Sequence, residues 1–153
     1  MQTMRNWLIG YYIVEFEQHG KDRAEYGSQL LKKLEERVNR KGLNVTLFKN
    51  ARNFYLLYPQ MEDNFVFLNV PLSNCEGIPK SPTVLDQLKT SGKLIIAKLS
   101  FSHIVEIMAV DDSLARYFYE QECIKCTWSV RELRRQISTN LYVRAGISSN
   151  PEK

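Results

Sequence analysis

The chain is 153 residues long, with 44% hydrophobic and 25% charged residues. This balance is typical of one folded globular domain, so it excludes a disordered chain and a small domain that needs disulfides or metal to fold. The formal net charge of +4 permits an anionic partner such as nucleic acid, but it is small enough to arise from surface composition alone.

The cysteines and the apolar runs bear on the compartment. The chain has three cysteines, an odd number, and no secretory leader precedes its first periodic segment. The longest apolar runs, 65–70 and 94–97, are much shorter than the roughly 18 residues that cross a bilayer. These features predict a reduced, cytoplasmic protein that has no disulfide framework and does not enter a membrane.

Two helices are predicted in the first part of the chain. In 4–18 large apolar residues recur at helical spacing until Gly20 interrupts the pattern. Asp22 can cap a second helix, which Gly42 ends. The apolar residues of this second helix share one face, while its charged residues fall largely on the other. The predicted apolar positions are Tyr26, Leu30, Leu31, Leu34 and Val38.

The third predicted helix runs between Asn44, whose side chain can act as an N-cap, and Pro59, which disfavours helix at the residue before it. Phe48 falls on the outward side of this helix. We therefore expect part of that side to pack against something else, the insertion or another subunit. The apolar face is predicted to comprise Leu47, Ala51, Phe54, Tyr55 and Tyr58.

The pattern changes in 60–92, where three prolines interrupt any regular element. We expect an irregular insertion there, with a short strand at 65–70 and one or two helical turns at 83–89. Helical periodicity returns at Lys93 and predicts several short packed helices. The predicted fold is therefore mainly α: a single multi-helix domain over 1–153 that contains a helix-turn-helix-like unit, winged or not, and the insertion.

The last predicted helix has the clearest start. Ser129 and Glu132 have the spacing of a capping box, in which each side chain accepts a hydrogen bond from the other residue's backbone. The buried stripe of this helix is predicted to consist of Val130, Leu133, Ile137 and Leu141. Its arginines then point away from the core.

Two helices carry candidate nucleic-acid contacts. A helix that ends at glycine, a short turn and a second helix with polar outer positions is what a helix-turn-helix needs, although any small helical domain contains such pairs. The arginines of the last helix lie side by side and could engage adjacent phosphates, or form a solvated face or an ion pair with Glu132. The candidates are Lys49, Asn50, Arg52 and Asn53 on the third helix, and Arg131, Arg134 and Arg135 on the last.

Metal and catalytic sites are not predicted. Cys123 and Cys126 have metal-ligand or redox spacing, and Cys75 with His103 could complete a zinc site. Such a pair within a helical stretch is usually a coincidence or belongs to the core. We therefore expect no metal and no cofactor. For His103, which follows Ser102, a bond from a helix-end histidine to a backbone carbonyl is the favoured interpretation.

A metal-dependent nuclease would need clustered acidic residues close to a lysine. The nearest candidates are Asp86 and Lys89, with Asp63 far upstream, and they do not form that cluster. No nucleophile motif and no glycine-rich phosphate loop occurs either. The chain is therefore predicted not to be an enzyme.

Several short motifs occur in a specific order. They are RAEYG at 23–27, the turn and helix at 41–59, LSFSH at 99–103, FYE at 118–120, WSVRELRRQI at 128–137 and LY at 141–142. Together they resemble the amino-terminal domain of the YhcG family of bacterial proteins, over most of the chain outside the insertion. The resemblance implies a helical, helix-turn-helix-like DNA-binding domain. In that family a carboxy-terminal nuclease domain of the PD-(D/E)XK type usually follows, and it is expected to be absent from this chain.

The preferred hypothesis is a non-catalytic DNA-binding domain of a nuclease-family protein. Lys49, Arg52 and the three arginines of the last helix would contact phosphates, and Asn50 and Asn53 would contact bases or phosphates. The alternative is a protein-interaction or dimerisation module that positions a nuclease domain in cis or in trans. That alternative predicts a homo-oligomer, an exposed apolar patch around Phe48 or the insertion, and no salt-dependent DNA affinity.

Overall fold

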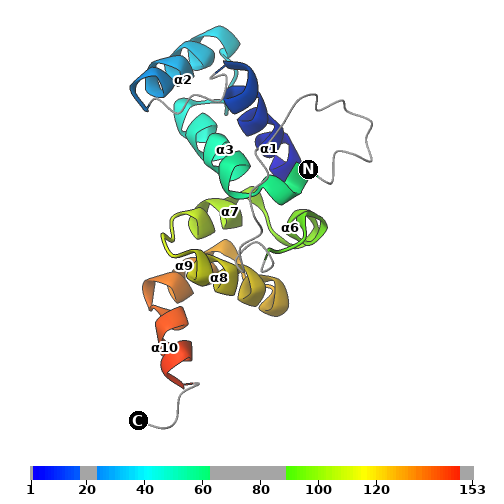
Figure 1. The fold of residues 1–153 in the computed structure, drawn as a ribbon, viewed down its shortest axis with the longest axis vertical. Helices are drawn as coiled ribbons and strands as arrows, with labels where there is room; N and C mark the ends of the chain where they lie inside the picture. Colours follow the sequence, from blue (N-terminus) through cyan, green and yellow to red (C-terminus); the bar gives the residue numbers. More distant parts are fainter. Residues whose placement is uncertain (1, 18–23, 63–88, 149–153) are drawn as a thin grey trace, which may run out of the picture. The chain divides into compact units, whose positions relative to one another are not determined.

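The structure is a computed structural model that describes residues 2–17, 24–62 and 89–148 (Figure 1). Every regular element in these residues is helical, so the mainly α fold predicted from the sequence is confirmed. The chain divides into two compact units, Met1–Pro59 and Gln60–Lys153, and each is described by itself. The α-helices are α1 (Gln2–Tyr12), α2 (Ala24–Val38), α3 (Val45–Leu57), α6 (Gly92–Lys98), α7 (Phe101–Met108), α8 (Ser113–Cys126), α9 (Val130–Ser138) and α10 (Leu141–Ser148), and the shorter helical turns are Ile13–Glu17 and Pro59–Glu62.

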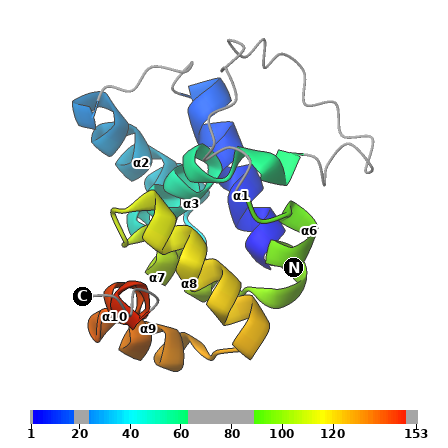
Figure 2. The ribbon, with the colours of Figure 1, turned by 60° about the horizontal axis from the view of Figure 1, so that its bottom comes forward.

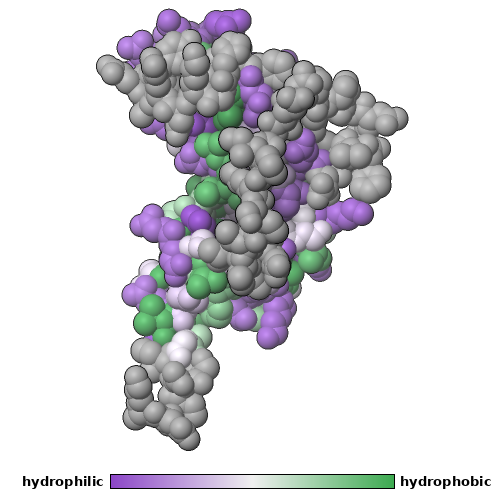
Figure 3. Space-filling model, viewed as in Figure 1, coloured by the Kyte–Doolittle hydropathy of each residue, from purple (hydrophilic) through white to green (hydrophobic). Residues whose placement is uncertain are grey.

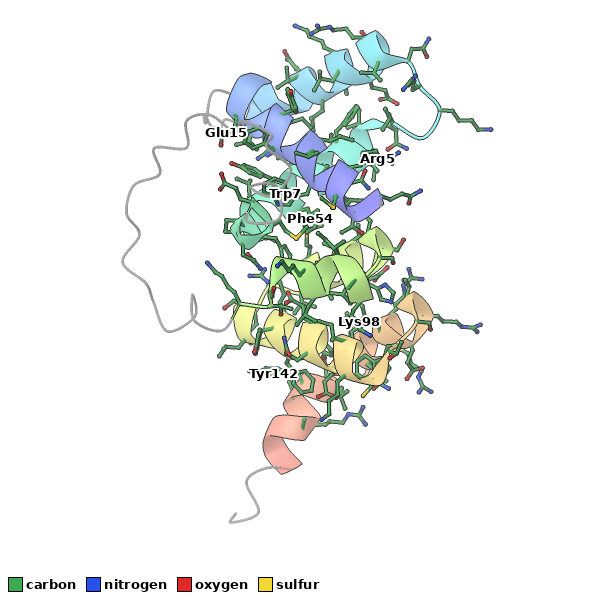
Figure 4. The ribbon with its side chains drawn as sticks, turned by 90° about the vertical axis from the view of Figure 1, so that its right-hand side faces the viewer. Arg5, Trp7, Glu15, Phe54, Lys98 and Tyr142 are labelled. Atoms are coloured by element: carbon green, nitrogen blue, oxygen red, sulfur yellow. The ribbon has the colours of Figure 1, made fainter. Side chains whose placement is uncertain are left out.

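In the first unit α1 and α3 pack closely against each other. A Cβ added at Gly10 would lie 2.0 Å from the backbone oxygen of Ala51, so only glycine allows the two helices to approach this closely. Trp7 and Phe54 are fully buried, and Figure 4 shows them in the region where these two helices meet. The indole Nε1 of Trp7 donates to the carbonyl of Tyr58 at 3.0 Å. This hydrogen bond joins the middle of α1 to the residue that directly follows α3.

The second contact within this unit joins α2 to α3. Phe48 is only 4% exposed and lies in a buried cluster with Ile13 and Leu31. The expectation that this side of α3 packs against something was therefore right, and among the described residues the segments that cover it are α2 and the helical turn at Ile13. Because α3 packs against α1 on one side and against α2 on another, its buried arc is wider than the stripe predicted from periodicity. The exposed apolar patch that the interaction-module hypothesis expects at Phe48 does not form there.

The second unit begins at the insertion, of which 63–88 lie outside the described residues. The strand predicted at 65–70 and all but the last residue of the turns predicted at 83–89 fall in that range. Thr90 is buried, donates to Glu120 Oε2 at 2.7 Å and accepts from Gln121 Nε2 at 2.8 Å. The chain that leaves the insertion is thereby attached to α8.

Helices α7, α8 and α9 pack together through short connections, as Figure 2 shows from below. Thr127 adopts the left-handed region with φ 52°, which ends α8 and allows α9 to start at Val130. Asn140 has the same φ of 52° and separates α9 from α10. The single last helix predicted to include Leu141 is therefore two helices. The buried side chains of this three-helix group include Ile104, Ile107, Ala115, Tyr119, Cys123 and Leu133.

Candidate nucleic-acid interface

The arginines of α9 occupy one exposed side of that helix. Leu133 is fully buried and fixes the orientation of α9, while Arg131, Arg134 and Arg135 are exposed. With Ser138 these arginines have the spacing i, i+3, i+4 and i+7, which places all four side chains on one helix face. The structure thus brings the three predicted arginines together and adds a serine hydroxyl that the sequence interpretation did not single out.

The start of α9 agrees in part with the predicted capping box. Ser129 Oγ accepts a hydrogen bond from the backbone of Glu132 at 3.2 Å. The Glu132 carboxylate turns instead toward its own helix, where its Oε1 accepts from Arg135 Nη2 at 2.7 Å and from Gln136 Nε2 at 2.7 Å. These two hydrogen bonds lower the pKa of Glu132 below its ordinary value. Glu132 is therefore ionised at neutral pH and holds Arg135 in place.

Arg134 has a different carboxylate partner, on α7. Its Nε and Nη2 both reach Glu106 Oε1, at 3.1 and 2.5 Å. The hydrogen bond and the charge of Glu106 raise the pKa of Arg134, so the guanidinium remains charged at any physiological pH. The side chains of Arg134 and Arg135 are still 66% and 68% exposed, and each can present further N–H donors to solvent.

Arg131 makes no ion pair or hydrogen bond through its side chain with any residue that the structure describes. Together the side chains of α9 enclose an open hollow of about 610 Å³, lined by Ser129, Arg131, Glu132, Arg134, Arg135 and Ser138. All residues that line this hollow belong to α9 and its N-cap. The shape of the hollow therefore depends on the rotamers of the arginines. Guanidinium and hydroxyl donors around an open concavity suit a phosphate group.

The candidates on α3 lie on a helix whose start is well defined, because Asn44 Oδ1 accepts from the backbone of Leu47 at 2.8 Å. Lys49 and Asn53 are one turn apart and exposed, whereas Asn50 and Arg52 are partly buried. These residues belong to the first unit and the arginines of α9 to the second. The candidate site is therefore described as two surfaces, one on each unit.

His103 has a structural position in the second unit. Its Nδ1 accepts from the backbone N–H of Ser100 at 3.1 Å, so Nε2 carries the proton and donates to the carbonyl of Trp128 at 2.8 Å. The favoured interpretation, a helix-end histidine that donates to a backbone carbonyl, is confirmed. This bond joins the start of α7 to the connection that precedes α9.

The two described cysteines differ in their surroundings. Cys123 is buried and Cys126 is exposed, while Cys75 lies outside the described residues. Burial raises the pKa of the Cys123 thiol from 9.0 to about 11, and the neighbouring Cys126 adds to this shift. Among residues 2–17, 24–62 and 89–148 no three His, Cys, Asp or Glu side chains are grouped closely enough to hold a metal ion.

Comparison with known proteins gives two matches. The sequence model of the family described as "DUF1016 N-terminal domain" matches residues 1–144. The Escherichia coli (strain K12) protein described as "Putative nuclease YhcG" is 36% identical over 148 residues, which cover 92% of this chain and 38% of that protein. The chain thus spans less than half of that relative's length. No solved structure shows significant similarity to the chain. None of the helices that the structure describes is long and apolar enough to cross a membrane.

Proposed function

The chain belongs to the family of DUF1016 N-terminal domains, and from that premise we propose that it binds double-stranded DNA without a catalytic step of its own. It does so as part of a nuclease-family protein, with the nuclease domain acting in cis or in trans. The association with nucleases follows from the similarity to the protein described as "Putative nuclease YhcG". We place this activity in the cytoplasm.

The observation that carries the proposal is the exposed face of α9. Three guanidinium groups within five residues, beside the hydroxyls of Ser129 and Ser138, form a donor-rich concavity on a helix that Leu133 fixes to the core. Arginine binds phosphate oxygens through paired N–H groups, and such contacts supply most of the sequence-independent affinity for duplex DNA. The connection Thr127–Trp128–Ser129 between α8 and α9 is short, as it is in helix-turn-helix units.

The carboxylates of Glu106 and Glu132 have a defined place in this proposal. They hold Arg134 and Arg135 in fixed positions, which reduces the side-chain entropy that phosphate binding would otherwise cost. They also compete with the phosphate for the same N–H donors. Arg131 has no such partner among the described residues, so all of its N–H donors are open to a phosphate.

On α3 we assign phosphate contacts to Lys49 and Arg52. Asn50 and Asn53 supply amide groups that can hydrogen-bond to base edges or to phosphates. Lys49 and Asn53 share one exposed side of the helix and make no hydrogen bond or ion pair through their side chains with a described residue. Both groups are thus available to a ligand in the structure as described.

The proposal is tested by fluorescence anisotropy with a labelled mixed-sequence duplex. The variant Arg131→Ala/Arg134→Ala/Arg135→Ala should lose most of the affinity of the wild type. A matched control, Lys93→Ala/Lys98→Ala/Lys125→Ala, removes three cations of the same unit that lie off α9 and should bind more tightly than the arginine variant. Equal binding by the wild type and the arginine variant would remove α9 from the interface.

A protein-interaction or dimerisation module remains the second candidate, and one observation favours it. Leu56 and Leu57, at the end of α3, are 49% and 40% exposed. Adjacent exposed leucines on a helix are a common feature of protein interfaces. This candidate predicts a homo-oligomer that the variant Leu56→Ser/Leu57→Ser dissociates, measured by analytical ultracentrifugation, and no salt-sensitive DNA binding.

A further inference from the structure

The positive charge of the chain is concentrated in its first unit. Residues 1–59 contain ten Lys and Arg against six Asp and Glu, which accounts for the whole formal net charge of +4. Residues 60–153 contain eleven of each and are formally neutral. The unit that carries α9 thus has no formal net charge, and the net positive charge that attracts a polyanion over long distances lies in the first unit.

Within the first unit the cations cluster around one connection. The ten residues 32–41 include five Lys and Arg and only two acids. Lys33 and Arg37 are one turn apart on α2, and Arg40 and Lys41 lie in the turn that leads to α3. All four side chains are exposed. Figure 4 shows nitrogen-tipped side chains standing out from α2 and from the turn after it.

None of these four cations is neutralised within the described part of the chain, where their side chains make no ion pair and no hydrogen bond. The arginines of α9 differ in this respect, because Arg134 and Arg135 are each bound to a carboxylate. A phosphate that binds to Arg134 or Arg135 meets a guanidinium whose charge a carboxylate already offsets and some of whose N–H donors are occupied. A phosphate that binds at the α2–α3 connection displaces only water and counterions.

The connection also has a defined conformation and open surroundings. Asn39 donates its backbone N–H to Glu35 at 2.9 Å, Leu43 donates to Arg40 at 3.1 Å, and Leu43 packs against the cluster that contains Phe48. Gly42 has φ 90°, and a Cβ built on it would meet no atom within 4 Å. The turn is therefore held by the core on one side and is accessible on the other. The space-filling view shows hydrophilic residues at the end of the unit that α2 forms (Figure 3).

We infer that Lys33, Arg37, Arg40 and Lys41, hereafter the α2–α3 basic turn, form a second phosphate-contacting surface for double-stranded DNA. This inference rests on the proposed function and adds to it a surface that the sequence interpretation treated only as the outer face of a helix. The basic turn supplies the attraction that the neutral second unit lacks. It also places cations directly before the helix that carries Lys49 and Asn53.

The test compares two double variants of the full chain that each remove two positive charges. Arg37→Gln/Lys41→Gln changes the basic turn. Lys98→Gln/Lys125→Gln changes two exposed lysines of the second unit whose side chains form no ion pair with a residue that the structure describes. Binding of a labelled duplex is followed by anisotropy over a series of salt concentrations. A third variant, Arg37→Lys/Lys41→Arg, keeps both charges, and circular dichroism establishes that all variants are folded.

We expect the basic-turn variant to reduce the slope of log K against log salt by about 2, since each phosphate contact contributes roughly 0.9 to it. The lysine control and the charge-preserving variant should keep the slope of the wild type. If the basic-turn variant binds like the control while the α9 arginine variant loses affinity, this inference is overturned and the proposed function stands. If the wild type fails to bind duplex DNA at low salt, both are overturned.

Discussion

Arg134 of α9 and Glu106 of α7 are bound to each other although 28 residues separate them in the chain. Two guanidinium nitrogens reach one carboxylate oxygen, so the pair both orients Arg134 and offsets its charge. Removing the carboxylate should therefore affect ligand binding more than folding, because exposed ion pairs contribute little to stability.

The variant Glu106→Gln should bind duplex DNA more tightly than the wild type. It removes the competitor for Arg134, and the slope of log K against log salt should steepen by about 1, corresponding to one more phosphate contact. Anisotropy titrations measure both quantities. Asp111→Asn is the control, because Asp111 is an exposed acid that forms no ion pair with a described residue. Equal effects of the two variants would show that only net charge matters.

The second prediction concerns the stability that the close contact between α1 and α3 provides. Gly10→Ala should lower the free energy of unfolding by roughly 1–3 kcal/mol, which is the typical cost of overpacking a core. The upper part of this range is expected because the obstructing atoms belong to the backbone. The added Cβ would lie 2.0 Å from Ala51 O and 2.6 Å from its carbonyl carbon. Urea denaturation of the full chain is the measurement.

Gly146→Ala is the matched control for that experiment. Gly146 lies in α10, and a Cβ there would meet nothing within 4 Å. In a helix interior alanine is more favourable than glycine by about 1 kcal/mol. This variant should therefore be at least as stable as the wild type. If Gly10→Ala were equally harmless, the close approach of α1 and α3 would be refuted.

The third prediction concerns the stability that His103 provides by joining α7 to the α8–α9 connection. His103→Ala removes the donor to Trp128 O and the acceptor for Ser100 N, and should destabilise the protein by about 1–3 kcal/mol. Ser102→Ala, an exposed neighbour on the same helix, should change the stability much less. Thermal unfolding followed by circular dichroism compares the two. A His103→Ala variant as stable as the wild type would contradict the structural role assigned to this side chain.

The fourth prediction concerns the reactivity of the two cysteines and the pH dependence of stability. A thiol with a pKa of about 11 is ionised in roughly one molecule in a thousand at pH 8, so Cys123 should resist iodoacetamide while Cys126 reacts. Because the unfolded chain ionises Cys123 at a lower pH than the folded protein, the stability due to this group is lost as pH rises from 9 to 11. Mass spectrometry of labelled peptides gives the reactivities. Rapid labelling of Cys123 in the folded protein would contradict its burial.

Local signals in the sequence were sufficient for the ends of several helices. The Asn44 cap and Pro59 bound α3 as predicted, and Ser129 caps α9. A cap or a proline acts on backbone groups a few residues away, so it can be recognised without knowledge of the fold. Asn140 carried a weaker signal: asparagine is enriched at positive φ, but whether it adopts that conformation depends on its surroundings as much as on its identity.

Contacts between distant residues could not be predicted in the same way. Phe48 is buried because α3 packs against α2 as well as against α1. The Glu106–Arg134 ion pair forms because α7 packs against α9. The α2–α3 basic turn was visible in the sequence as charge. Its lack of carboxylate partners among the described residues became apparent only from the structure.

The most direct test of the central claim is the salt dependence of wild-type binding to a labelled mixed-sequence duplex, measured by anisotropy between about 50 and 200 mM salt. Phosphate binding by the exposed cations predicts measurable affinity at low salt and a linear fall of log K with log salt that corresponds to several contacts. Absence of binding at the lowest salt concentration, or affinity that does not change with salt, would contradict it.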